Sequence, residues 1–173
     1  MLHGIIGNSF FLTRPILFDF KARQVSVWGS GPLSAADLAE AGISSGADVP
    51  LTDPQHSLKY AVDGLVNGKA AQRFVVDTGS GETVLARAAA NQLGLVAAGK
   101  ARTRPTFHGI LDLLVGRVEA ISLGGSDVAT AADVTWPADG AQDANPVLGL
   151  GVLSRYKMLY DIPGKRIRLM PYQ

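Results

Sequence analysis

The chain has 173 residues, of which 47% are hydrophobic, and its formal net charge is +1. That length suits one domain of ordinary size, or one domain with an added fragment. The small charge and the short basic runs argue against a nucleic-acid-binding surface, so we expect no nucleic-acid partner. The absence of cysteine excludes disulfides, thiolate catalysis and zinc–thiolate sites.

The three histidines lie far apart in the sequence and lack the spacing of metal ligands, so we expect no metal site and no cofactor. No apolar run reaches the roughly 18–20 residues of a membrane span. The residues after Met1 show no charged region followed by an apolar one, so we expect no signal peptide in this sequence. The sequence does not decide the cellular compartment, because a periplasmic or secreted protein with a shortened N terminus would have the same features.

The first region, residues 4–28, reads as apolar strand material. "ILFDF" at 16–20 and "QVSVW" at 24–28 predict two strands around the polar turn "KAR". These strands carry too much apolar surface to stay free in solvent, so we expect them to pair with the domain or with a second chain.

Residues 29–57 are rich in Gly, Pro, Ser and Ala and predict a linker with one short helix. In "SAADLAEAG", Ser34 suits the N-cap and Asp37 follows it by three residues, as in a capping box. Gly42 is placed to end the helix.

The strand pattern resumes at Leu58. Asn67-Gly68, between two apolar runs, is a strong hairpin signal. After a turn at 78–82, residues 85–93 carry helix-forming residues, with Gly94 placed to stop them.

The rest of the chain alternates between short strands and turns. A strand region before the Gly124-Gly125 turn is followed by a second, "DVATAADVTW", and by a loop rich in Pro, Asp, Gly and Asn. The last part predicts a short helix and then two strands around "PGK", at 151–156, 158–162 and 166–170.

This last part resembles the first. Subtracting 142 from residue numbers 146–170 gives 4–28 without gaps, and apolar positions agree nearly throughout. Gly7, Leu17 and Asp19 are identical to their counterparts. Two amphipathic strand pairs could agree by chance, but an internal repeat is the better explanation. We therefore expect the C-terminal remnant of an upstream repeat at 1–28, a linker at 29–57 and a complete repeat at 58–173.

The stretch "FVVDTGSGETVL" places Asp77 at the end of an apolar strand, in a tight turn. One explanation is structural, because Asp initiates turns with its own side chain. The other is catalytic: two carboxylates held close together share one proton, so that one acts as base and the other as acid.

Three segments together resemble the retropepsin-like aspartic protease superfamily, most of all bacterial aspartyl protease family proteins, some of which carry tandem repeats. They are "FVVDTGSGETVL", the following "LARAAANQLGL" and the distant "PVLGLGVLSRYKMLYDIPGKRIRL". The resemblance covers roughly 58–171. It implies an all-β fold: a closed, barrel-like sheet with a ψ-type loop and one or two short helices.

The resemblance also implies roles for individual residues. Asp77 becomes the catalytic carboxylate, Thr78 the residue that locks two active-site loops together, and Gly79 the position of close approach. Ser80 is expected to hydrogen-bond the outer carboxylate oxygen. The run Val147-Leu148-Gly149, which ends 72 residues after Asp77, is expected to thread beside the loop and support it.

The family's flap, a hairpin that closes over substrate, is expected between the helix and the Gly124-Gly125 turn. The candidate tip is Thr106-Phe107-His108-Gly109-Ile110, which has less glycine than the usual family flap. Phe107 fits either a substrate pocket or the core.

The chain contains no second Asp-Thr-Gly or Asp-Ser-Gly. A working pair of carboxylates therefore needs a second copy of this chain, as in a twofold dimer, or the upstream repeat of a longer parent. The predicted function is an aspartic endopeptidase half-site acting on a peptide or protein substrate, with Asp77 as one of the two carboxylates.

Two alternatives come from other classes. "VVDTGSGET" also resembles the phosphate-binding turn of actin- and hexokinase-like ATPases, but the chain lacks the length and the helices of their two lobes. A repeat of the same fold could also serve as a non-catalytic dimerisation or peptide-binding module, by adding an extended peptide to a strand edge.

Overall fold

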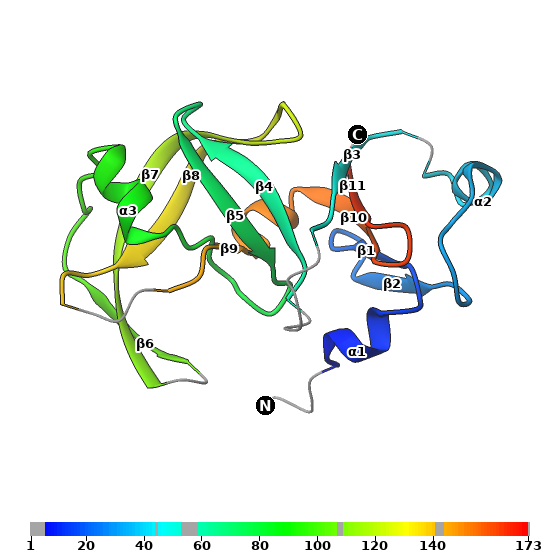
Figure 1. Cartoon of the computed structure of the whole chain (residues 1–173), viewed down its shortest axis with the longest axis horizontal. Helices are drawn as coiled ribbons and strands as arrows, with labels where there is room; N and C mark the ends of the chain where they lie inside the picture. The colour runs from blue at the N-terminus through cyan, green and yellow to red at the C-terminus, as the bar shows by residue number, and fades with distance from the viewer. Residues whose placement is uncertain (1–5, 44, 53–58, 107–108, 141–143, 173) are drawn as a thin grey trace. The chain divides into compact units, whose positions relative to one another are not determined.

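The protein is mostly β-structure with short helices, as predicted (Figure 1). The computed structural model describes residues 6–43, 45–52, 59–106, 109–140 and 144–172. The chain divides into two compact units. Unit 1 combines Met1–Ala61 with Ser154–Gln173, and unit 2 is Val62–Leu153. No helix in the described part of the chain is long and apolar enough to cross a membrane.

Unit 1 is built on a five-stranded antiparallel sheet in the order β2-β1-β10-β11-β3. Its strands confirm the two predicted strand pairs and add β3, and β1 pairs with β10 as the apolar sequence of the first pair required. The bounds are β1 (Ile16–Asp19), β2 (Gln24–Val27), β3 (Ala47–Pro50), β10 (Tyr156–Asp161) and β11 (Arg166–Pro171).

The segment predicted as a linker forms part of unit 1. Helix α2 (Ala35–Glu40) begins at the predicted N-cap Ser34, and Ser34 and Asp37 form a complete capping box. Leu38 of α2 is buried in a core cluster with residues of β1, β10, β11 and the linker. The other members are Leu17, Leu33, Ile43, Leu159 and Met170, with Trp28 packed against them.

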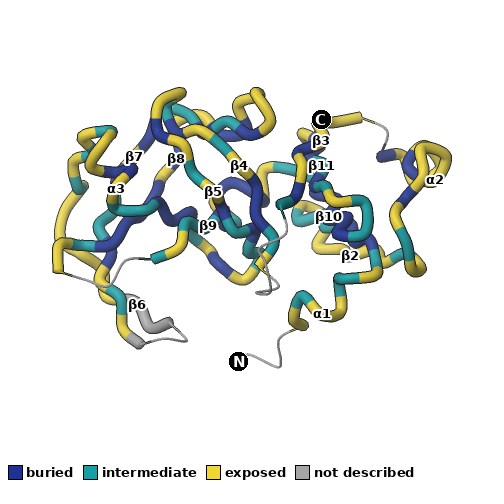
Figure 2. The backbone as a smooth tube through the Cα atoms, in the orientation of Figure 1, coloured by how far each residue is buried: buried dark blue, intermediate teal, exposed yellow. Residues whose placement is uncertain are grey.

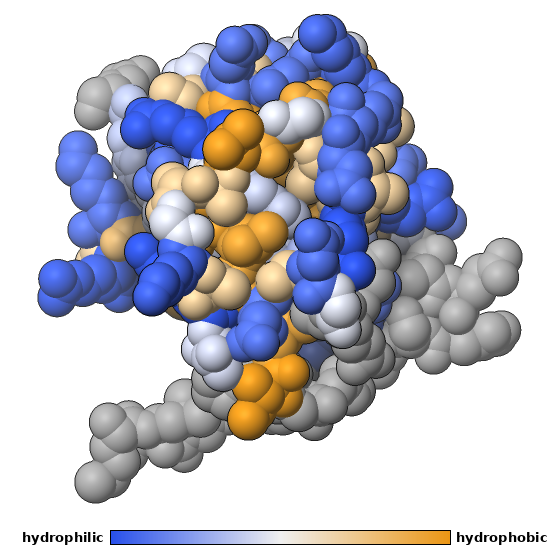
Figure 3. Space-filling view, turned by 90° about the vertical axis from the view of Figure 1, so that its left-hand side faces the viewer, coloured by the Kyte–Doolittle hydropathy of each residue, from blue (hydrophilic) through white to orange (hydrophobic). Residues whose placement is uncertain are grey.

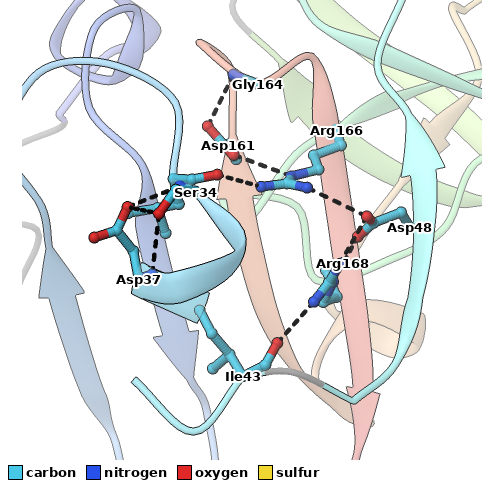
Figure 4. Close-up of polar contacts among 9 residues, drawn as sticks. Ser34, Asp37, Ile43, Asp48, Asp161, Gly164, Arg166 and Arg168 are labelled. Carbon is cyan, nitrogen blue, oxygen red and sulfur yellow. Dashed lines mark hydrogen bonds and ion pairs between the residues drawn. The ribbon is translucent and has the colours of Figure 1, made fainter. Parts of the chain in front are cut away.

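A polar network joins this segment to β11 (Figure 4). Arg168 donates to both oxygens of Asp48, at 2.5 and 2.7 Å. Arg166 donates to Asp161 at 3.1 Å and lies 3.4 Å from Asp48. The hydrogen bonds from Arg168 lower the pKa of Asp48. Both guanidinium groups also donate to main-chain carbonyls, those of Leu33 and Ile43.

Unit 2 contains a six-stranded sheet in the order β6-β7-β4-β5-β9, with β8 paired to β7. Val84 forms isolated bridges to Val147 of β9 and to Thr135 of β8, which connect these two strands without closing the sheet into a continuous barrel over the residues that the structure describes. The elements are β4 (Ala61–Val66), β5 (Ala70–Val76), β6 (Arg102–Thr106), β7 (Gly109–Leu123), β8 (Ser126–Pro137), β9 (Val147–Leu148), α3 (Arg87–Gln92) and α4 (Leu150–Leu153). Helices α3 and α4 confirm the two that were predicted near 85–93 and 151–156.

The offset of 142 residues recurs in the backbone. Helix α1 (Asn8–Phe11) corresponds residue for residue to α4. Asp19 and Asp161 each accept a hydrogen bond of 2.9 Å from the N–H three residues further on. Arg23 and Lys165, both four residues after these aspartates, have left-handed φ angles of 57° and 53°, which are uncommon outside glycine. These matches support an internal repeat; the proposed domain boundaries stay a prediction.

Candidate active site

Asp77 comes directly after β5, whose Phe74 and Val76 are buried. β5 pairs in parallel with β9, so that Val76 stands opposite Leu148. The N–H of Asp77 donates to the Leu148 carbonyl at 3.1 Å. The backbone of Asp77 is therefore fixed by a strand that lies far from it in sequence, while its side chain is only half-buried.

The carboxylate closes its own turn. Asp77 Oδ1 accepts a hydrogen bond of 2.8 Å from the N–H of Gly79. A Cβ at Gly79 would lie 3.1 Å from the same oxygen, so glycine suits this close approach. A purely structural turn would show the same bond, so the bond by itself does not separate the two explanations for Asp77.

The run Val147-Leu148-Gly149 lies between two segments of the Asp77 region. On one side it pairs with the end of β5. On the other, Val147 and Val84 exchange hydrogen bonds of 2.9 Å in both directions. The structure therefore brings this predicted run beside the Asp77 turn.

Gly149 lies directly beneath the rest of that turn. Its N–H donates to Thr83 Oγ1 at 3.2 Å. A Cβ at Gly149 would overlap the Glu82 carbonyl and lie 2.8 Å from the Ser80 carbonyl oxygen. Only glycine fits between the backbones, although its φ is not left-handed.

The hydrogen bonds of two polar residues near Asp77 were not foreseen from the sequence. Ser80, predicted to bond the outer oxygen of Asp77, instead donates its hydroxyl to the Glu82 carbonyl at 2.8 Å. Thr83 was not predicted, yet it is 1% exposed and carries the bond to Gly149. The available signal was that Thr83 directly precedes the apolar residues Val84 and Leu85, as a buried hydroxyl with a structural partner would.

The candidate flap falls on a hairpin of β6 and β7. Thr106 stands opposite Gly109, the last pair before the tip. The side chain of Ile110 is 77% exposed. Phe107 and His108 lie outside the described residues, so the role of this flap stays a prediction.

A cavity of about 350 Å³ opens beside the Asp77 turn. Its wall carries charges of both signs, from Glu82 and Arg102. Thr135 also lines it, and the buried Oγ1 of that residue has no hydrogen-bond partner in the described part of the chain. The remaining lining residues are Gly81, Thr103 and Leu113.

Among the described residues, no group of three or more His, Asp or Glu side chains is placed to hold a metal ion. The expectation of a site without metal or cofactor therefore stays a prediction.

Comparison with known proteins gives two similarities. The family model described as "gag-polyprotein putative aspartyl protease" matches residues 62–155. The crystal structure of a retropepsin-like aspartic protease from Rickettsia conorii superposes with a TM-score of 0.52 at 20% sequence identity, covering 72% of this chain and 98% of that one. At that identity, the structural match shows the fold alone. Comparison with the curated proteins gives no match.

Proposed function

This chain belongs to the retropepsin-like aspartic protease family, and from that membership we propose that it supplies one of the two carboxylates of an aspartic endopeptidase. Family and fold support an aspartic-type peptidase. The observation that carries the proposal is the way Asp77 is held. Its backbone is fixed by Leu148 and one of its oxygens by Gly79, with Gly149 packed beneath the turn.

In the proposed mechanism, Asp77 faces a second aspartate and the two share one proton. The ionised carboxylate removes a proton from a water molecule, which attacks the scissile carbonyl carbon. The protonated carboxylic acid donates to the carbonyl oxygen, giving a neutral tetrahedral diol. Collapse of this diol breaks the C–N bond as a proton passes to the leaving amine. No acyl-enzyme forms, because water is the nucleophile.

The second aspartate must come from another repeat, because the chain has a single Asp-Thr-Gly. Thr78 and Gly79 would meet their counterparts from that repeat. The cavity beside Glu82 and Arg102 would take side chains of an extended peptide bound across the two repeats.

A non-catalytic binding module is the second candidate. Apolar surface divided by hydrophilic side chains is visible on the face of unit 2 in Figure 3. Val96 and Ile110 of this unit are 84% and 77% exposed. Such surface favours a bound peptide or partner strand, with Asp77 then serving only to close its turn.

Peptide hydrolysis should be measured at acidic and neutral pH on two proteins. One is this chain, over a series of concentrations. The other, here called the joined chain, places residues 29–145 ahead of residues 4–173. Because residue 146 corresponds to residue 4, the joined chain rebuilds two consecutive repeats and carries Asp77 twice.

We expect hydrolysis wherever two copies of Asp77 meet. A homodimer would make the rate per chain rise with concentration, whereas a tandem arrangement would show activity only in the joined chain. Asp77→Asn in either copy should abolish activity, and Asp139→Asn, at an exposed loop position, should not. Serine- and cysteine-directed inhibitors and chelators should have no effect. Hydrolysis by Asp77→Asn at the wild-type rate would refute the mechanism.

A further inference from the structure

The pairing of β1 with β10 has an internal symmetry. Leu17 stands directly opposite Leu159, which is its own counterpart at the offset of 142 residues. The neighbouring pairs, Ile16 with Tyr160 and Phe18 with Met158, also exchange under that offset. The four strands β2-β1-β10-β11 are therefore related by a local twofold axis between equivalent leucines.

This symmetry shows that β1 occupies the place beside β10 that β10 of a second copy would take in a twofold dimer. If two copies of the chain paired through β10 about a twofold axis, Leu159 would stand opposite Leu159 of the other copy. In this chain β1 already takes that place along four residue pairs. Leu17 and Leu159 share one buried cluster, and Lys157 Nζ lies 3.1 Å from Asp19 Oδ2. The edge that a homodimer would use is filled by the chain itself.

The outer edges of the sheet differ. β3 pairs with β11 along Arg166–Leu169; the equivalent stretch of β2 is 24–27, which pairs only on its β1 side in the described part of the chain. Val25 is 58% exposed where its counterpart Ile167 is 0% exposed. Figure 2 shows β2 as an exposed strand. The edge of β11 in this symmetric sheet is therefore covered by β3, whereas the equivalent edge of β2 is exposed.

The chemistry of the open edge also differs from that of the covered one. On β11, Arg166 and Arg168 hold Asp48 of the added strand. The equivalent residues of β2 are Gln24 and Ser26. An incoming strand therefore has no cation to meet at these positions, and it needs apolar side chains toward the Val25 face.

We propose that β2 and the exposed side chains of Val25 and Val27 are the docking surface for the rest of a second retropepsin-like repeat, of which β1 and β2 are the closing hairpin. That repeat adds a strand to the free edge of β2. A second copy of this chain is not the partner, because its repeat is already completed by its own β10 and β11 and its β3 is already paired with that β11. That the docked repeat also brings the second aspartate rests on the proposed function; the docking itself does not.

The first test uses the absence of native cysteine. In a Leu17→Cys/Leu159→Cys variant, mild oxidation should give an intramolecular disulfide at a yield independent of protein concentration, since directly opposed residues of antiparallel strands lie within disulfide reach. Leu159→Cys alone should give no more disulfide-linked dimer than the exposed control Val96→Cys. A higher dimer yield from Leu159→Cys overturns the proposal.

The second test is the mass of the unmodified chain in sedimentation equilibrium, which does not depend on any buried thiol. We expect the mass of one chain at micromolar concentration. A stable homodimer overturns the proposal.

The third test examines the surface itself. Alkylation of Val25→Cys should be about as fast as that of Val96→Cys in this chain. In the joined chain, the same Val25→Cys change lies in the β1–β2 hairpin just after the junction. Alkylation there should be slower by roughly tenfold or more, because a covered thiol reacts only through local opening. Equal rates, or a joined chain that does not fold, overturn the proposal. Labelling needs no catalysis, so a failure here is distinct from a failure of the proposed function.

Discussion

The hairpin of β1 and β2 and the hairpin of β10 and β11 have the same local conformation but differ in how far their strands are buried. Each follows a four-residue helix, and each closes with an aspartate bond and a left-handed residue. Yet every residue of β2 is exposed, whereas Ile167, Leu169 and Met170 of β11 are buried. The shape of a hairpin is set locally by its turn, whereas its burial depends on what packs against it.

The glycines before the two hairpins show the same contrast. A Cβ at Gly7 would meet nothing within 4 Å, whereas one at Gly149 would overlap the backbone of the Asp77 turn. The requirement for glycine at 149 therefore comes from the turn above it and not from the local backbone.

The largest expected difference follows from these glycines. Gly149→Ala should lower the free energy of unfolding by about 3 kcal/mol or more, because two backbones must separate. Gly7→Ala should stay within about 0.5 kcal/mol of the wild type. Urea unfolding of both variants measures the difference. Equal losses would mean that the two positions have the same surroundings in solution.

A second difference concerns apolar burial. Ile167→Ala should destabilise by about 2–4 kcal/mol, since it empties a fully buried site. Val25→Ala, at an exposed site, should change stability by less than about 0.5 kcal/mol. Thermal unfolding at one protein concentration is the measurement. A large loss for Val25→Ala would show that β2 is already covered in this chain.

A third difference concerns pH. The hydrogen bonds from Arg168 hold the pKa of Asp48 below its ordinary value of 3.8. Because the folded-state pKa is the lower one, this contribution to stability is present above pH 3.8 and is lost as the pH falls through the folded-state value. Stability should therefore drop in acid, and less steeply for Asp48→Asn. Urea unfolding between neutral pH and strong acid tests this, and parallel curves for the two proteins would contradict it.

The smallest expected effect lies at the two turns. Arg23→Gly and Lys165→Gly each relieve a left-handed side-chain conformation and each increase the freedom of the unfolded chain. The two terms nearly cancel, so both changes should stay below about 1 kcal/mol and share one sign. Opposite signs in chemical denaturation would show that the two turns are not equivalent.

Much of the molecule was predictable because its signals are local. The Ser34 cap, both hairpins and the short helices follow from neighbouring residues. The Asp77 turn and the run at 147–149 follow from a recognisable pattern of residue types.

What could not be predicted depends on distant partners. β3 is four residues long and lies in the segment predicted as a linker. It is a strand because β11 offers a free edge and two arginines that bind Asp48. The bridges from Val84 to β8 and β9, and the role of Thr83, also require strands that are remote in sequence. Ser80 was assigned to Asp77 because it lies nearby in the sequence, whereas its hydroxyl donates to the Glu82 carbonyl.

The position of β9 has a consequence for the order of assembly. β9 is hydrogen-bonded on one side to β5 and on the other to Val84, so both contacts span most of unit 2. Contacts of such long sequence separation form late, because the intervening loop must first be closed. We therefore expect the turn at Asp77 to stay unformed during synthesis until residues 147–149 have emerged. The nascent chain would then contain the Asp77 carboxylate well before the folded active-site turn exists.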